Sequence, residues 1–222
     1  MYCLETVVRK LLSEFLTEDE LSDSWEARIV VNSLLERGVL LKEGDKLIAP
    51  DRVSLVEALL SYGFTAEYLA RLLTWKAFEE FLGGVFDRHG YSLIRNFRFS
   101  RSGRRFEVDV LALKKPLVIC VECKHYKRPR TVAPDRRILE RHAERTKALA
   151  DSIPGLSLEL GVSGWGKIKV LPLVVTLLQE GFYRKIPVVP VFKLNSFLLE
   201  LDANIDLMCC FEAVASNYLK IM

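Results

Sequence analysis

Two carboxylates and a lysine lie in segments whose other residues favour buried β structure. Asp109 belongs to a strand expected over residues 106–113, and Glu122 and Lys124 end the apolar run that begins at Leu117. Side chains alternate between the two faces of a strand, so Glu122 and Lys124 point to the same side. Burying such charges costs several kcal/mol per ion unless something compensates them. A divalent metal and a phosphodiester would compensate them, so the pattern favours a metal-dependent nuclease.

Asp109 and Glu122 are expected to lie close together. Glu122 follows Asp109 by 13 positions, and the turn Lys114-Lys115-Pro116 separates the two strands, which would make them antiparallel neighbours. Mg²⁺ is typically bound by one or two carboxylates together with waters and substrate oxygens. Such a metal lowers the pKa of a water and neutralises charge on the phosphate. A lysine beside the carboxylates can orient the water or stabilise the transition state.

The order of these residues resembles the PD-(D/E)xK nuclease superfamily, most closely its Mrr-type restriction endonuclease branch, with archaeal Holliday-junction resolvases nearby. A helix carrying Phe78-Glu79 runs to Gly90-Tyr91, and a strand, a turn, the Asp109 strand and the Glu122-Cys123-Lys124 strand follow. The resemblance covers roughly residues 72–200. Val108 replaces the proline of the family formula, at a position that varies within the family.

The resemblance implies a role for each matched residue. Asp109 and Glu122 would bind Mg²⁺, with Mn²⁺ as a substitute, and the backbone carbonyl of Cys123 would add a ligand. Lys124 would act on the attacking water. Glu79 would reach the metal directly or through water, with Glu80 as the alternative. The resemblance also implies an α/β restriction endonuclease-like core with a central mixed sheet flanked by helices, DNA as the substrate, and a homodimer as a way to cut both strands.

Basic residues surround the predicted site. The candidates for binding DNA lie on the hairpin turn and after the Glu122 strand: Arg101, Arg104, Arg105, Lys127, Arg128 and Arg130. Further basic residues, Arg145 among them, lie on a helix expected over 134–151, where an ordinary solvated face is the alternative interpretation. His142 on that helix is expected at the surface. Residues 63–222 carry 25 Lys/Arg against 17 Asp/Glu, which favours a polyanionic partner.

Residues 1–62 predict a winged-helix-like domain that precedes the nuclease-like domain of residues 63–222. Helices are expected over 5–16 and 24–37, with a short helix opened by the capping box Thr17–Glu20 between them and a hairpin over 39–49. The domain carries 7 Lys/Arg against 12 Asp/Glu. Phosphate contacts dominate affinity for DNA, so this acidity favours protein interaction, dimerisation or packing over DNA reading.

Other interpretations stay open on the residues alone. Glu122 and Lys124 could form a structural ion pair, Asp109 could cap a turn, and Glu79 could be a solvated helix residue. Two alternative functions remain. One is a catalytically silent nuclease fold that binds DNA or protein, and the other is a regulator that binds DNA through the winged helix.

Structural zinc is disfavoured because Cys120 and Cys123 would point to opposite faces of a strand. No apolar run spans a bilayer and no signal peptide opens the chain, so the predicted location is cytoplasmic, with no membrane partner.

Overall fold

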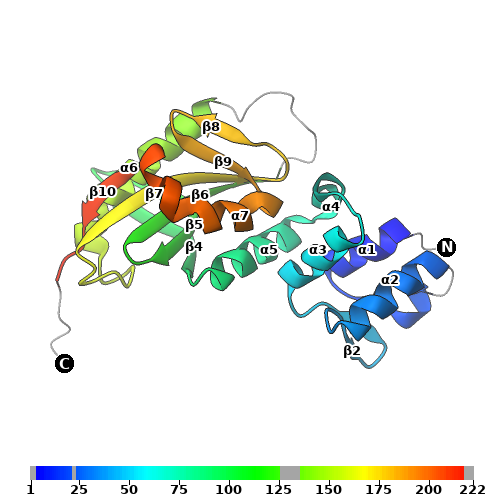
Figure 1. The fold of residues 1–222 in the computed structure, drawn as a ribbon. Coiled ribbons are helices and arrows are strands. Elements are labelled where there is room, and N and C mark those ends of the chain that lie inside the picture. Colours follow the sequence, from blue (N-terminus) through cyan, green and yellow to red (C-terminus); the bar gives the residue numbers. More distant parts are fainter. Residues whose placement is uncertain (1–3, 22–23, 126–135, 218–222) are drawn as a thin grey trace, which may run out of the picture. The chain divides into compact units, whose positions relative to one another are not determined.

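The computed structural model describes residues 4–21, 24–125 and 136–217, and the chain divides into two compact units, 1–85 and 86–222 (Figure 1). Three of the predicted DNA-binding residues, Lys127, Arg128 and Arg130, lie outside the described residues. The predicted functional division after residue 62 falls inside the first unit and stays a prediction.

The first unit is a helical region with a small three-stranded sheet. Its elements are α1 (Leu4–Ser13), β1 (Leu16–Thr17), α2 (Trp25–Glu36), β2 (Leu41–Glu43), β3 (Lys46–Ile48), α3 (Arg52–Ser61), α4 (Ala66–Leu72) and most of α5 (Trp75–Arg88). The strands are antiparallel in the order β1-β3-β2. Side-chain caps start several of the helices; at α2 Ser24 accepts the N–H of Ala27, and at α3 Asp51 accepts those of Val53 and Ser54.

The short second helix expected from the capping box is wrong in its type. Leu16 and Thr17 instead pair with β3 as a strand, and only one turn of 3-10 helix follows at Glu18–Leu21. One half of the box is present, because the Thr17 N–H donates to Glu20 Oε2 over 3.0 Å. Thr17, which would have begun an α-helix, is instead paired with β3.

The second unit is built on a mixed sheet. Its strands are β4 (Ser92–Arg101), β5 (Arg104–Lys114), β6 (Leu117–Lys124), β7 (Lys167–Thr176), β8 (Gly181–Tyr183), β9 (Ile186–Pro190) and β10 (Phe211–Val214). The order is β4-β5-β6-β7-β9-β8, and β10 also pairs with β7. The β4–β5 and β5–β6 pairs are antiparallel, whereas β6–β7 and β7–β9 are parallel. The predicted α/β class with a central mixed sheet is confirmed.

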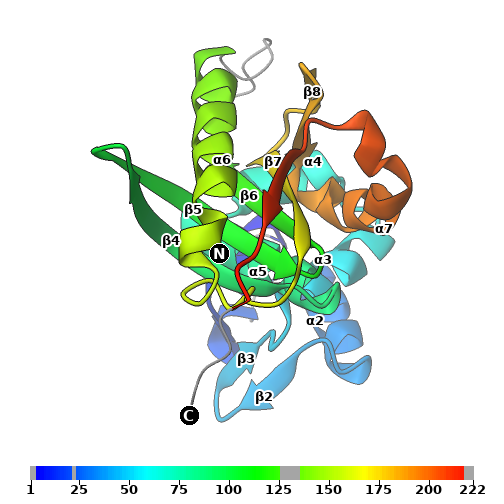
Figure 2. The same cartoon turned by 90° about the vertical axis from the view of Figure 1, so that its left-hand side faces the viewer.

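Helix α6 (Arg136–Leu156) connects the parallel strands β6 and β7 and lies across one face of the sheet (Figure 2). Parallel neighbours need such a crossover. Leu149, Ala150 and Ile153 of α6 belong to the same buried cluster as Leu111 and Cys120 of the sheet. The helix runs five residues beyond its predicted end, because Ile153 continues this buried stripe. Helix α7 (Leu194–Asn204) packs against β9.

Within the described ranges, each helix is too short or too polar to cross a bilayer.

Candidate active site

The register of β5 and β6 places Asp109 and Glu122 next to each other. Val110 pairs with Val121 in this antiparallel ladder, so Asp109 and Glu122 are the next residue outward on each strand. Side chains at such facing positions share one face of the sheet at close separation. Two residues further along each strand, Leu111 and Cys120 lie in the core under α6. The two carboxylates therefore belong to the α6 side of the sheet.

Glu122 is a buried carboxylate with a cation on each oxygen. Its residue is only 6% exposed. Lys124 Nζ lies 2.5 Å from Oε1, and Arg145 Nη1 donates to Oε2 over 2.8 Å. Burial raises the pKa of Glu122, but the Lys124 hydrogen bond and the charge of Arg145 outweigh burial and hold that pKa below its usual value. Glu122 is thus ionised despite its burial.

Asp109 is held against the end of the same strand. Its Oδ2 accepts the backbone N–H of Cys123 over 2.9 Å. Burial, aided by the neighbouring charge of Glu122, raises the pKa of Asp109 more than the Cys123 bond and the charges of Lys124 and Arg145 lower it. The raised pKa of Asp109 means that its ionised form is less well compensated than that of Glu122, and a cation placed beside it would stabilise that form.

His142 of α6 lies beneath Glu122, so the expectation of a surface histidine is wrong. The side chain is fully buried, and its Nε2 is 2.9 Å from the carbonyl of Cys120. A carbonyl only accepts, so Nε2 carries the proton and donates, and Nδ1 presents a lone pair 3.9 Å from Glu122 Oε2. Burial lowers the pKa of His142 to about 4. The neutral ring lies in the inward stripe of α6 with Leu139 and Thr146.

Arg145 is a site residue that the sequence left among the ordinary basic residues of its helix. Besides its bond to Glu122, Nη1 donates to the carbonyl of Glu107 over 2.7 Å, and the side chain is 21% exposed. Arg145 lies three residues after His142 and one before Thr146, both of which are buried on the face of α6 that packs on the sheet. This spacing is the only indication in the sequence that Arg145 borders that buried face. The guanidinium links α6 to both β5 and β6.

Comparison with known proteins bears directly on this part of the chain. Residues 70–148 match the Mrr_cat family, described as restriction endonuclease. Residues 70–148 are a Mrr_cat restriction endonuclease domain of PD-(D/E)xK-like type. The predicted resemblance is confirmed. The Mrr_cat domain contains Glu79, Asp109, Glu122, Lys124 and Arg145, and it begins in the first compact unit.

The names of other similar proteins state no function. An "Uncharacterized protein" of Archaeoglobus fulgidus is 28% identical over 131 residues, which cover 58% of this chain and 92% of that protein. A crystal structure titled "Protein of Unknown Function AF1548" matches with a TM-score of 0.31 at 14% identity and covers 50% of this chain. Protein VC1899 from Vibrio cholerae matches with a TM-score of 0.34 at 14% identity and covers 92% of this chain. The chain spans about half the length of each of these two structures.

The Mrr_cat domain carries the three predicted hairpin arginines at the tip of the β4–β5 hairpin, which extends away from the rest of the sheet (Figure 2). Ser102 and Gly103 both have positive φ, as a tight two-residue hairpin turn requires. Arg101 donates to the carbonyl of Asp151 over 2.8 Å, and Arg104 lies over the ring of Phe106. Arg101, Arg104 and Arg105 are exposed.

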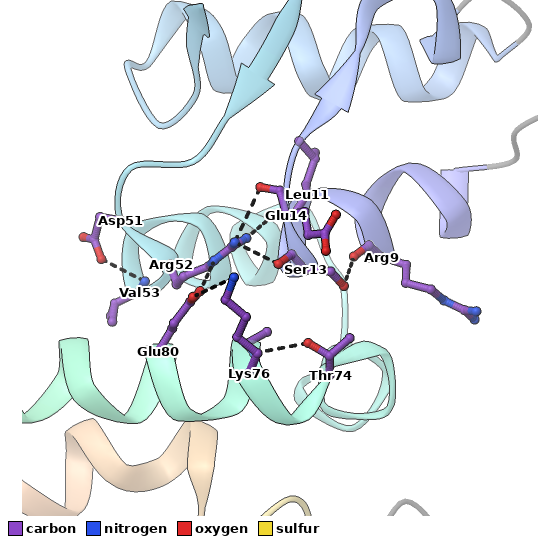
Figure 3. A network of polar contacts seen from close by, with 11 residues as sticks. Arg9, Leu11, Ser13, Glu14, Asp51, Arg52, Val53, Thr74, Lys76 and Glu80 are labelled. Carbon is purple, nitrogen blue, oxygen red and sulfur yellow. Dashed lines mark hydrogen bonds and ion pairs between the residues drawn. The ribbon is translucent and has the colours of Figure 1, made fainter. Parts of the chain in front are cut away.

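Glu79 lies on α5 of the Mrr_cat domain and is half-buried. Its neighbour Glu80 accepts from Arg52 Nε over 3.1 Å, and Lys76 Nζ lies 3.9 Å from Glu80 (Figure 3). Consecutive residues of an α-helix point about 100° apart. Glu79 is therefore directed differently from Glu80, which faces Arg52.

Arg52 links Glu80 to the end of α1. The guanidinium donates to the carbonyl of Ser13 over 3.1 Å and also to that of Leu11 (Figure 3). The last carbonyls of a helix have no partner within the helix, so Arg52 satisfies groups that would otherwise lack one. Its side chain is only 15% exposed.

We expect Arg52→Met to lower the free energy of unfolding by about 2–4 kcal/mol, because hydrogen bonds to charged groups are worth about 1.5–3 kcal/mol each and α1 loses its cap. Urea unfolding followed by circular dichroism measures the change. Lys76→Met, which removes an exposed cation from the same glutamate, is the control and should change stability by less than about 0.5 kcal/mol. Equal effects of the two substitutions would show that Arg52 does not anchor α1.

The chemistry of the donor set in the Mrr_cat domain fits a hard divalent cation. Among the described residues, no group of three or more His, Cys, Asp or Glu side chains lies close enough to hold a metal. The facing strand positions of Asp109 and Glu122 offer two carboxylates, and Mg²⁺ commonly takes one or two from a protein alongside water and substrate oxygens. Burial and the charge of Glu122 raise the pKa of Asp109, and a cation bound beside Asp109 would stabilise its ionised form.

Proposed function

We propose that the chain is a Mg²⁺-dependent endonuclease that hydrolyses DNA phosphodiester bonds, of the restriction or the DNA repair and recombination type. The observation that carries this proposal is the pairing of Asp109 with Glu122 on facing strand positions, with Lys124 2.5 Å from Glu122. The match of residues 70–148 to a restriction endonuclease family supports the same reaction class.

In this proposal Asp109 and Glu122 hold the metal, together with the backbone carbonyl of Cys123. Glu79 supports the site directly or through water. When bound, the metal supplies an activated water and neutralises charge on the phosphate; Mn²⁺ would serve in place of Mg²⁺. These assignments follow the order of the residues in the family.

Lys124 is suited to act on the attacking water. Glu122 fixes its ammonium at one end of the site, and 24% of its side chain is exposed, so water reaches it. An ammonium at this position orients the lone pairs of the water by donating to its oxygen, and it stabilises negative charge as that charge develops. Glu122 would thus serve both the metal and the lysine.

The tip of the β4–β5 hairpin would bind the DNA backbone. We expect Arg104→Ala/Arg105→Ala to weaken duplex binding about tenfold at physiological salt and to reduce the salt dependence of binding by about two ions, because each arginine that contacts a phosphate releases about one counterion. Fluorescence anisotropy across a salt series, with Ca²⁺ in place of Mg²⁺, measures both quantities.

Arg184→Ala/Lys185→Ala is the matched control for the hairpin. These two residues form another basic hairpin tip in the same unit, between β8 and β9, and both have positive φ. This variant should bind DNA like the wild type. A loss of affinity as large as that of the Arg104/Arg105 variant would mean that only net charge matters.

A cleavage panel tests the proposed function. Plasmid, single-stranded, flap and four-way-junction DNA are incubated with the full chain in Mg²⁺, in Mn²⁺ and in EDTA. We expect cleavage within at least one substrate, with either metal and not in EDTA. Binding of DNA without cleavage of any substrate would overturn the proposal in favour of a catalytically silent binding module, and cleavage in EDTA would overturn its metal dependence.

A further inference from the structure

Arg145 occupies the oxygen of Glu122 that faces α6. Its Nη1 lies 2.8 Å from Glu122 Oε2 and 2.7 Å from the carbonyl of Glu107. Both hydrogen bonds come from this one nitrogen. Among the described residues, Nε and Nη2 of Arg145 therefore remain as donors for a further acceptor.

The charges in the site balance in this arrangement. Asp109 and Glu122 face Lys124 and Arg145, so two carboxylates meet two cations. A divalent cation added between the carboxylates would leave an excess of positive charge. An anionic phosphate entering the site would remove part of that excess. The phosphate also offers the two resident cations an anionic partner other than the carboxylate.

Arg145 is better suited than Lys124 to exchange the carboxylate for the phosphate. Lys124 lies two residues from Glu122 on the same strand, whereas Arg145 reaches the site from a different element, α6. A guanidinium also presents several donors in a planar fork that matches phosphate oxygens.

We infer that Arg145 is a phosphate-binding residue that holds Glu122 until metal and DNA arrive and then transfers from the carboxylate to the scissile phosphate. This inference rests on the proposed function, because it assumes that Glu122 binds metal. The guanidinium competes with the metal for Glu122 Oε2 and joins the metal in binding the substrate.

The transfer predicts two effects of opposite sign for Arg145→Met. The variant should bind Mg²⁺ at least about threefold more tightly, because the cation that competes for Glu122 is gone. It should bind duplex DNA in Ca²⁺ about tenfold more weakly, with a salt dependence reduced by about one ion, because one phosphate contact is lost. Calorimetric titration with Mg²⁺ alone and anisotropy with a DNA duplex measure these effects without reference to cleavage.

Arg141→Met is the control, because it removes the same charge from an exposed position on the same helix. The Nε of Arg141 donates to the carbonyl of Arg137 on its own helix. It should leave Mg²⁺ affinity unchanged and weaken DNA binding by less than about twofold. Arg145→Lys keeps a cation and should bind Mg²⁺ like the wild type. If Arg145→Met does not fold, Arg145→Gln, which can still donate to the Glu107 carbonyl, provides the same comparison.

The outcomes separate the inference from the function on which it rests. Weaker Mg²⁺ binding by Arg145→Met would mean that the arginine only orients Glu122, and unchanged DNA binding would mean that it does not contact phosphate; either result overturns the transfer. Wild-type protein that binds Mg²⁺ and cleaves DNA would leave the proposed function standing in both cases. Wild-type protein that neither binds Mg²⁺ nor cleaves would overturn the function and the inference together.

Discussion

Asp109→Asn should reduce DNA cleavage in Mg²⁺ by at least about a thousandfold, because a metal contributes several kcal/mol of transition-state stabilisation and each 1.4 kcal/mol is about tenfold in rate. The amide oxygen can still accept the N–H of Cys123, a bond of 2.9 Å in the wild type, so the strands stay in place. The variant loses the negative charge with which Asp109 is proposed to hold the metal. Single-turnover cleavage of the best substrate measures the loss.

Glu107→Gln is the matched control for Asp109→Asn, since it makes the same change two residues earlier on β5. Glu107 is ion-paired with Arg98 and its side chain is 47% exposed, so its carboxylate lies at the surface. We expect cleavage within about threefold of wild type. DNA binding in Ca²⁺ should remain largely intact for Asp109→Asn. Full cleavage by Asp109→Asn would exclude this carboxylate from the metal site.

Lys124→Met should reduce the cleavage rate by about a hundredfold to a thousandfold, the usual cost of removing a group that stabilises developing charge. The substitution keeps the apolar stem in a position that is about three-quarters buried, and Arg145 still neutralises Glu122. The effect should fall on kcat, with KM and thermal stability close to wild type. Steady-state kinetics and a thermal melt separate the two kinds of effect.

Lys115→Met provides the comparison for Lys124, because it removes a lysine from the exposed turn between β5 and β6. Its cleavage should match that of the wild type. A rise in KM with unchanged kcat in Lys124→Met would assign this lysine to DNA binding. A large loss of thermal stability would support the structural ion pair instead.

The sequence was sufficient to place the two carboxylates. Strand side chains alternate with a period of two. The short turn after residue 113 determines the antiparallel register between the strand before it and the strand after it. Asp109 and Glu122 are therefore facing positions, as the Val110–Val121 pair shows. Local rules of this kind need no knowledge of the rest of the chain.

The α6 side of the site could not be derived in this way. The rotation of α6 about its axis depends on how its stripe packs against the sheet, and this packing buries His142 and brings Arg145 to Glu122. A basic helix with 3.6-residue periodicity fits a solvated face equally well. Strand β10 was missed for a related reason, since its pairing with β7 is a contact between segments about forty residues apart.

We propose that Asp109 and Glu122 bind the divalent metal that drives DNA cleavage. Anomalous diffraction from crystals soaked in Mn²⁺ shows the position of the ion independently of any activity. We expect a peak within coordination distance of both Asp109 and Glu122, and its loss in Asp109→Asn crystals. A peak that persists in Asp109→Asn crystals, or no peak beside these carboxylates in the wild type, would contradict this proposal.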